Sequence, residues 1–193
     1  MKKVILSLAL LAGMTGAAQA QTGVRFGLKG GINYTTLTAK NTDGIESKLG
    51  LQAGAFANLG LSDLISIQPE VLYSQKGFQS KDASKNKAKF NYIDIPVLVK
   101  VNAGGLFFEA GPQLGILASA KVTDGSTDVD IKENLNTVDF GYVAGLGYQL
   151  ETGPMIGLRY NGGITDIAKD GNNDNKTRNS AFQLYVGYTF GGK

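Results

Sequence analysis

The sequence predicts an all-β protein: an eight-stranded antiparallel up-and-down transmembrane β-barrel that follows a signal peptide. Three observations predict it. The N-terminus has the parts of an export signal, the rest of the chain contains eight stretches of alternating apolar and polar residues, and the gaps between these stretches are in turn short and long. Alternation with a period of two is typical of a strand with one apolar and one polar face.

The first twenty residues have the order of a secretory signal. Lys2 and Lys3 give the positive n-region, residues 4–11 form the apolar h-region, and Ala18 and Ala20 are small residues at the cleavage positions. The apolar run is too short to span a bilayer as a helix. We therefore expect residues 1–20 to be a cleaved signal peptide and residues 21–193 to be one outer-membrane β-barrel domain. The alternative is a buried N-terminal helix.

The eight alternating stretches each have about the length that a tilted strand needs to cross a bilayer. They comprise residues 24–34, 49–59, 64–75, 90–101, 106–118, 138–150, 154–162 and 181–190.

Short and long gaps follow one another along the chain. Tight turns are expected at residues 62–63, 102–105 and 151–153, and long polar loops at residues 36–48, 77–89, 121–137 and 164–180. Transmembrane barrels have short periplasmic turns and longer extracellular loops. This pattern predicts the outer membrane as the location and places both termini in the periplasm.

The apolar face is expected to contact lipid, because the opposite face combines glycine with Gln, Asn and charged residues, which suits a narrow lumen filled by side chains. The apolar face also carries aromatic residues near both ends of the strands, as membrane interfaces favour. The first group is Phe26, Phe108, Tyr148, Tyr188 and Phe190; the second is Tyr34, Tyr73, Phe140, Tyr142 and Phe182. The alternative is a soluble periplasmic barrel that binds a small apolar ligand inside.

Eight charged residues fall on the inward face. They form a candidate lumen charge network of Arg25, Lys29, Glu70, Asp94, Lys100, Glu109, Asp139 and Arg159. Counted from the short-turn ends of the strands, the residues expected at a similar depth in the lumen are Lys29, Glu70, Asp94 and Arg159. The residues expected at a lower depth, closer to the short turns, are Arg25, Lys100 and Glu109. The favoured interpretation is a set of neutralising salt bridges, since unpaired buried charge is unfavourable. The alternative is an ion-conducting constriction.

The composition argues against an enzyme. The chain has no histidine and no cysteine, so catalytic arrangements that depend on either residue are excluded. Asp170, Asn172 and Asp174 begin like a calcium loop, but the required glycine and closing glutamate are missing. We expect no catalytic residue, metal or cofactor, and no nucleic-acid partner, because no long basic run occurs.

Four segments resemble the porin-family outer-membrane β-barrel domain proteins, which are small barrels of Gram-negative bacteria. They are FGLKGGINY at 26–34, QPEVLYSQKG at 68–77, YIDIPVLVK at 92–100 and RYNGGITDI at 159–167. The resemblance implies an outer-membrane barrel and brings no substrate or catalytic residue. Such barrels often end on an aromatic residue that the insertion machinery reads; here Phe190 is followed by three more residues.

The sequence thus predicts a non-enzymatic integral outer-membrane barrel with a filled lumen and a structural or surface-interaction role. The alternative function is a narrow channel for ions or small solutes. The expected partners are outer-membrane lipid, the insertion machinery through the strand that ends at Phe190, and an extracellular ligand at the long loops. Two of these loops differ in charge, since residues 77–89 are rich in lysine and residues 121–137 in acidic residues.

Overall fold

The computed structural model describes residues 23–38, 45–80, 86–124, 127–169 and 176–191. The expected signal peptide and the residues Asp170, Asn172 and Asp174 lie outside the described residues. The elements are β1 (Val24–Thr38), β2 (Ile45–Gly60), β3 (Ile65–Ser80), β4 (Asn86–Ala103), β5 (Leu106–Asp124), β6 (Thr127–Asp130), the short 3-10 helix η1 (Lys132–Asn134), β7 (Val138–Gln149), β8 (Pro154–Gly163) and β9 (Arg178–Thr189).

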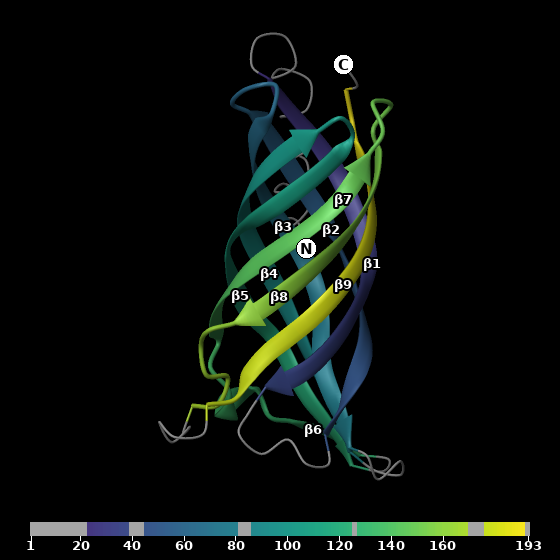
Figure 1. Ribbon diagram of the computed structural model, residues 1–193. Helices are drawn as coiled ribbons and strands as arrows, with labels where there is room; N and C mark the ends of the chain where they lie inside the picture. Colours follow the sequence, from purple (N-terminus) through teal and green to yellow (C-terminus); the bar gives the residue numbers. More distant parts are fainter. Residues whose placement is uncertain (1–22, 39–44, 81–85, 125–126, 170–175, 192–193) are drawn as a thin grey trace, which may run out of the picture.

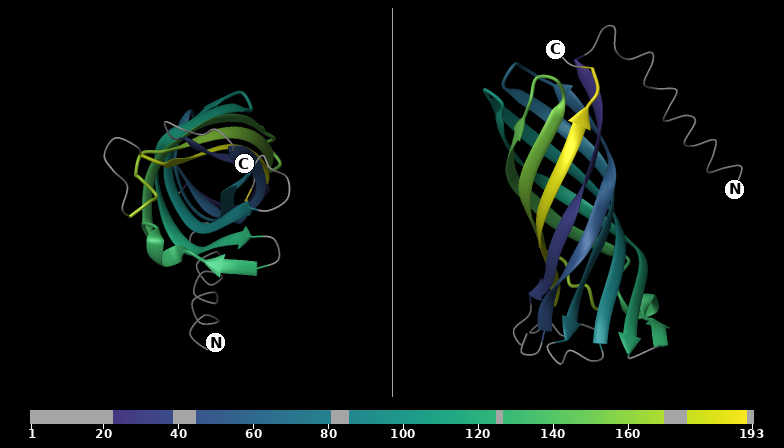
Figure 2. Two further views of the ribbon diagram at one scale, coloured as in Figure 1. Left: turned by 90° about the horizontal axis from the view of Figure 1, so that it is seen from below. Right: turned by 90° about the vertical axis from the view of Figure 1, so that its right-hand side faces the viewer.

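Eight long antiparallel strands form one closed barrel, as the sequence predicts (Figures 1 and 2). The strands follow the order β4-β3-β2-β1-β9-β8-β7-β5, and pairing of β4 with β5 closes the ring. The short strand β6 pairs with the far end of β5 and lies beside the ring when the barrel is viewed along its axis (Figure 2). None of the helices in the described part of the chain is long and apolar enough to cross a membrane.

Tight turns gather at one end of the barrel, which we call the short-turn end; the opposite end is the long-loop end. Gly104 and Gly105 join β4 to β5 with φ angles of 60° and 95°, in the left-handed region that glycine adopts without strain. Both ends of the described chain lie here. The Phe190 backbone N–H donates to the Phe26 carbonyl at 2.7 Å, which holds the end of β9 beside the start of β1.

The apolar residues face outward, which confirms the predicted orientation of the strands. Val97 on β4 and Leu184 on β9 are exposed. Polar residues at the alternate positions of the strands, such as Glu70 on β3, are almost completely buried. Most of the aromatic residues assigned to the two belts are also exposed, and Phe26 is half-buried. An exterior of this kind suits hydrocarbon, and its polar interior does not suit the alternative of a soluble barrel with an apolar ligand.

Several strands extend beyond the predicted boundaries at the long-loop end. β1 continues to Thr38, β3 to Ser80 and β5 to Asp124, and β4 already begins at Asn86. Much of the segments predicted as loops at 36–48, 77–89 and 121–137 is therefore strand. The sequence conceals this because a strand outside the membrane needs no apolar outer face, so its outward positions can be polar.

Candidate functional site

The centre of the lumen holds a cluster of two cations and two carboxylates. Lys29 donates to Glu70 at 2.6 Å, and Arg159 contacts both Glu70 oxygens at 2.8 Å through its two terminal nitrogens. The same guanidinium donates to Glu109 through Nη2 at 2.8 Å and through Nε. All four residues are buried, and their formal charges sum to zero. We call Lys29, Glu70, Glu109 and Arg159 the central cluster.

The central cluster crosses the whole lumen. Arg159 lies on β8 and Glu70 on β3, and these strands are four positions apart in the ring in either direction. They therefore stand on opposite walls of the barrel. A two-pronged contact of an arginine with a carboxylate fixes the orientation of both groups and is stronger than a neutral hydrogen bond.

Further polar and aromatic groups complete this layer. The Tyr185 hydroxyl donates to Glu109 at 2.8 Å, and the Gln68 amide donates to Glu70 at 2.7 Å. The Tyr185 ring lies 4.5 Å from the Lys29 ammonium and 4.7 Å from the Arg159 guanidinium carbon. The hydrogen-bond donors around the carboxylate oxygens compensate these groups for the loss of water. The aromatic ring does the same for the two cations.

Gly145 on β7 provides space for the Arg159 side chain. A Cβ atom at this position would lie 2.8 Å from Arg159 Cγ and 3.1 Å from a Glu109 oxygen. These distances are shorter than ordinary van der Waals contact. The interleaving of small and charged residues on the inward face therefore has a direct geometric reason.

A second ion pair lies nearer the long-loop end. Lys76 donates to Asp94 at 3.1 Å, and its ammonium lies 4.7 Å from the Tyr92 ring. Asp139 accepts a hydrogen bond from the Asn179 amide at 2.8 Å, and the same amide donates to the Tyr92 hydroxyl at 3.3 Å. These contacts make a second polar layer across the lumen.

The lumen near the short-turn end is more open. Lys100 donates to Gln149 at 2.7 Å, and Gln149 donates to Thr189 at 3.0 Å. The Lys100 ammonium also lies 3.9 Å from the Phe107 ring. Beneath these residues is a cavity of about 220 Å³, lined by Arg25 and by the three tight turns. Arg25 is half-buried and makes no ion pair with any described residue.

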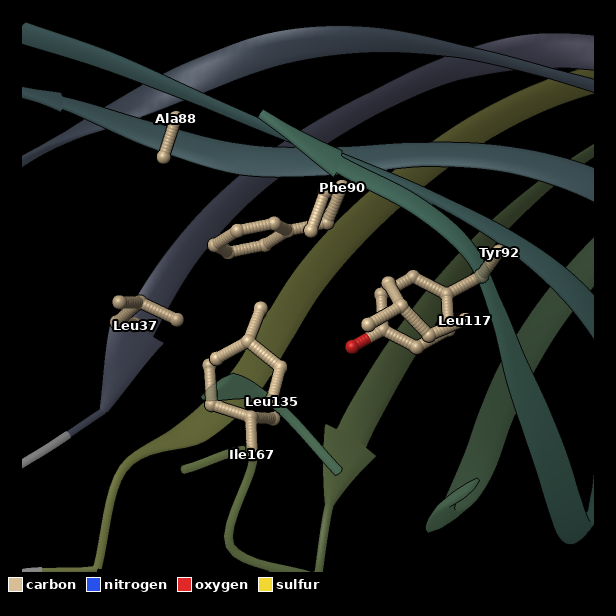
Figure 3. Packing of buried hydrophobic residues seen from close by; sticks show 8 residues of the cluster. Leu37, Ala88, Phe90, Tyr92, Leu117, Leu135 and Ile167 are labelled. Carbon is tan, nitrogen blue, oxygen red and sulfur yellow. The ribbon is translucent and has the colours of Figure 1, made fainter. Parts of the chain in front are cut away.

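An apolar cluster occupies the lumen at the long-loop end (Figure 3). Leu135, which follows η1, and Ile167, which follows β8, pack with inward-facing residues of the barrel wall. We call this cluster the apolar cap; its buried members are Leu37, Ala88, Phe90, Tyr92, Leu117, Ala120, Leu135 and Ile167. The segments that carry Leu135 and Ile167 are also joined by hydrogen bonds, since the Asn136 side-chain amide donates to the carbonyls of Asp166 and Ala168.

The structure groups the eight candidate residues differently from the prediction. Glu109, expected at a lower depth, joins Arg159 in the central cluster, while Asp94, expected beside Glu70, pairs with Lys76 in the second layer. Position along a strand does not give depth directly, because the strands of a barrel are tilted and staggered against one another.

Sequence reasoning missed several inward-facing residues. Lys76 lies one residue beyond the predicted end of its strand, and extending the alternation from Ser74 would have identified it. Phe107 and Tyr185 occupy inward positions by the same alternation and form a small buried cluster with Phe56 and Met155. The lumen is therefore less polar than a filling of glycine and neutralised ions alone.

Known proteins support the fold at low sequence identity. The crystal structure of Neisserial surface protein A (NspA) is similar with a TM-score of 0.59 and 17% identity, over 87% of this chain and 99% of that one. The crystal structure of Ail, the attachment invasion locus protein of Yersinia pestis, in complex with the heparin analogue sucrose octasulfate, has a TM-score of 0.52 and 15% identity. That match covers 86% of this chain and 99% of Ail. No curated protein matches the chain.

The two structural matches are too distant to assign the chain to a family, but a family model does assign it. The model described as outer membrane protein beta-barrel domain matches residues 18–169, which is most of the chain. The match includes β1 to β8 and all four residues of the central cluster. The chain belongs to the outer membrane protein beta-barrel domain family, whose members sit in the lipid bilayer of the outer membrane.

Proposed function

We propose that this protein is a non-enzymatic outer-membrane barrel whose lumen is closed and whose role is structural or lies in surface interaction. The observation that carries the proposal is the Arg159–Glu70 contact, which joins opposite walls of the barrel inside a neutral, buried cluster. The apolar cap adds a second closure. In the proposed orientation the short-turn end and both termini are periplasmic, and the long-loop end is extracellular.

Ion conduction would require both closures to open. Breaking the central cluster leaves buried charge without a partner, which is strongly unfavourable in a protein interior. Apart from the Tyr92 hydroxyl, the buried side chains of the apolar cap lack the polar groups with which a permeating ion replaces its water. These two layers favour a closed lumen over the alternative of a narrow channel.

Recording from the purified barrel in planar lipid bilayers tests the closed lumen. We expect no stable unitary conductance from the wild-type protein. A reproducible unitary conductance would overturn the proposal. In that case Glu70→Gln, which changes a charge in the central cluster, should alter the ion selectivity and thereby identify the conducting path.

The surface-interaction role is best supported by exposed lysines at the long-loop end. Lys87 and Lys89 on β4 and Lys121 on β5 point outward and are exposed. Lys89 and Lys121 are directly opposite each other in the antiparallel pair, an arrangement that is unfavourable without a counter-charge. Asp130 on β6 lies opposite Lys121 on its other side and supplies one such charge.

We infer that this lysine patch contacts a polyanionic glycan, as Ail does with a sulfated sugar in its complex. The test is salt elution of the purified barrel from immobilised heparin. Lys89→Gln should elute at lower salt than the wild type, because one ionic contact is lost. Lys169→Gln is the control, because it removes the same charge from an exposed lysine that lies after β8 and outside the patch. Equal elution of both variants would argue against the patch.

A further inference from the structure

The outer wall of the barrel carries an apolar groove on strands other than those of the lysine patch. It crosses β1, β9, β8 and β7 and has a volume of about 570 Å³. One row of lining residues is aromatic, with Tyr34, Phe182 and Tyr160 on adjacent strands, and the next row is aliphatic, with Leu184, Leu158 and Leu146. Ala144 ends the aromatic row and leaves space beside Tyr160.

The aromatic row marks the membrane interface at the long-loop end. The rings of Tyr160 and Phe182 are 5.1 Å apart, and the Ser180 hydroxyl donates to the Tyr160 hydroxyl at 3.1 Å. Tyrosines with an apolar ring and a hydrogen-bonded hydroxyl are typical of the headgroup level. The aliphatic row therefore lies in the hydrocarbon of the leaflet at this end.

Arg178 stands on β9 in line with the groove, on its headgroup side. It shares the outward column of Ser180 and Phe182, and four residues of strand place it about 13 Å beyond Phe182. Its side chain is half-buried, and its Nε atom is buried with no acceptor among the described residues. A long arginine side chain can reach along an apolar surface while its guanidinium stays at the polar boundary.

We propose that the groove holds one acyl chain of an anionic lipid whose phosphate pairs with Arg178. An arginine whose Nε atom has no acceptor among the described residues, placed beyond the aromatic row and in line with an apolar groove, is complementary to a molecule with a phosphate at one end and a hydrocarbon chain at the other. In the proposed orientation this is a lipid of the outer leaflet. The inference depends on the barrel lying in a bilayer and is independent of whether the lumen conducts.

Native mass spectrometry of the full chain released from detergent micelles tests the site, with phosphatidylglycerol and phosphatidylcholine titrated separately. We expect one phosphatidylglycerol retained per barrel in preference to phosphatidylcholine. Arg178→Gln should reduce the retention of phosphatidylglycerol about fivefold and leave that of phosphatidylcholine unchanged. Inorganic phosphate at millimolar concentration should not displace the lipid, because it lacks the chain that fills the groove.

Filling the groove gives a second, independent arm. Ala144→Trp should abolish retention of both lipids, because the indole occupies the space beside Tyr160. Ala53→Trp is the matched control, an exposed alanine on the outer face of β2 and outside the groove. Heat-modifiable gel migration shows that each variant is folded. Equal retention of the two lipids by the wild type, equal behaviour of the two tryptophan variants, or a protein dimer in place of a bound lipid would each overturn the proposal.

Discussion

Replacing Arg159 with methionine removes the cation that contacts both Glu70 and Glu109. The central cluster then keeps one cation, Lys29, and two carboxylates, so a neutral set becomes a set with one net negative charge. Glu109 retains the Tyr185 hydroxyl but loses its ion pair. The perturbation thus leaves an uncompensated charge inside the barrel and changes nothing on its outer face.

Breaking a buried ion pair by removing one partner destabilises proteins by about 3–5 kcal/mol. The contacts of Arg159 are buried and two-pronged, so the upper half of this range is expected. The double variant Arg159→Met with Glu109→Gln restores neutrality, because Lys29 and Glu70 remain as a pair. It should recover more than half of the lost stability.

Urea unfolding in lipid vesicles, followed by heat-modifiable gel migration, measures the effect. With a denaturant slope of about 2 kcal/mol per molar urea, the midpoint of Arg159→Met should fall by about 2–2.5 M. Arg25→Met is the matched control at the open mouth of the lumen, and it should change stability by no more than about 0.5 kcal/mol.

Two results would refute this reasoning. A midpoint of Arg159→Met equal to that of Arg25→Met would mean that the central cluster does not stabilise the barrel. A double variant no more stable than Arg159→Met alone would mean that the loss arises from packing of the long side chain and not from unbalanced charge.

Three further predictions concern the lumen, the outer face and the apolar cap. Gly145→Val should destabilise the barrel by about 1–3 kcal/mol or prevent refolding, because the new side chain would clash with Arg159. The control Ala144→Val, one residue away and outward-facing, should have little effect in the same unfolding assay. Leu184→Arg should lower the free energy of unfolding in vesicles by about 2–4 kcal/mol, whereas Val129→Arg on β6, beyond the membrane, should leave it unchanged. Similar losses of stability in the two variants would contradict the proposed lipid-facing side. Leu135→Ala should speed hydrogen exchange around η1 without changing gel migration, and unchanged exchange would mean that this leucine does not hold the apolar cap in place.

The sequence alone determined the number of membrane strands and the side that each residue faces. A strand has a side-chain period of two, so Val97 and Glu70 could be assigned to opposite sides without any knowledge of their neighbours. Short gaps after alternate strands then indicated which ends meet in tight turns. Both inferences use only residues close together in the sequence. The structure confirms both of them.

The partners of the inward charges depend on the whole barrel. Glu109 meets Arg159, and Asp94 meets Lys76, because the tilt and stagger of eight strands decide which residues share a level. Beyond the membrane the outer face no longer has to be apolar, so the ends of the strands could not be read from hydropathy. The apolar cap likewise joins Leu37, Leu117 and Ile167 from distant parts of the chain, and only closure of the ring brings them into contact.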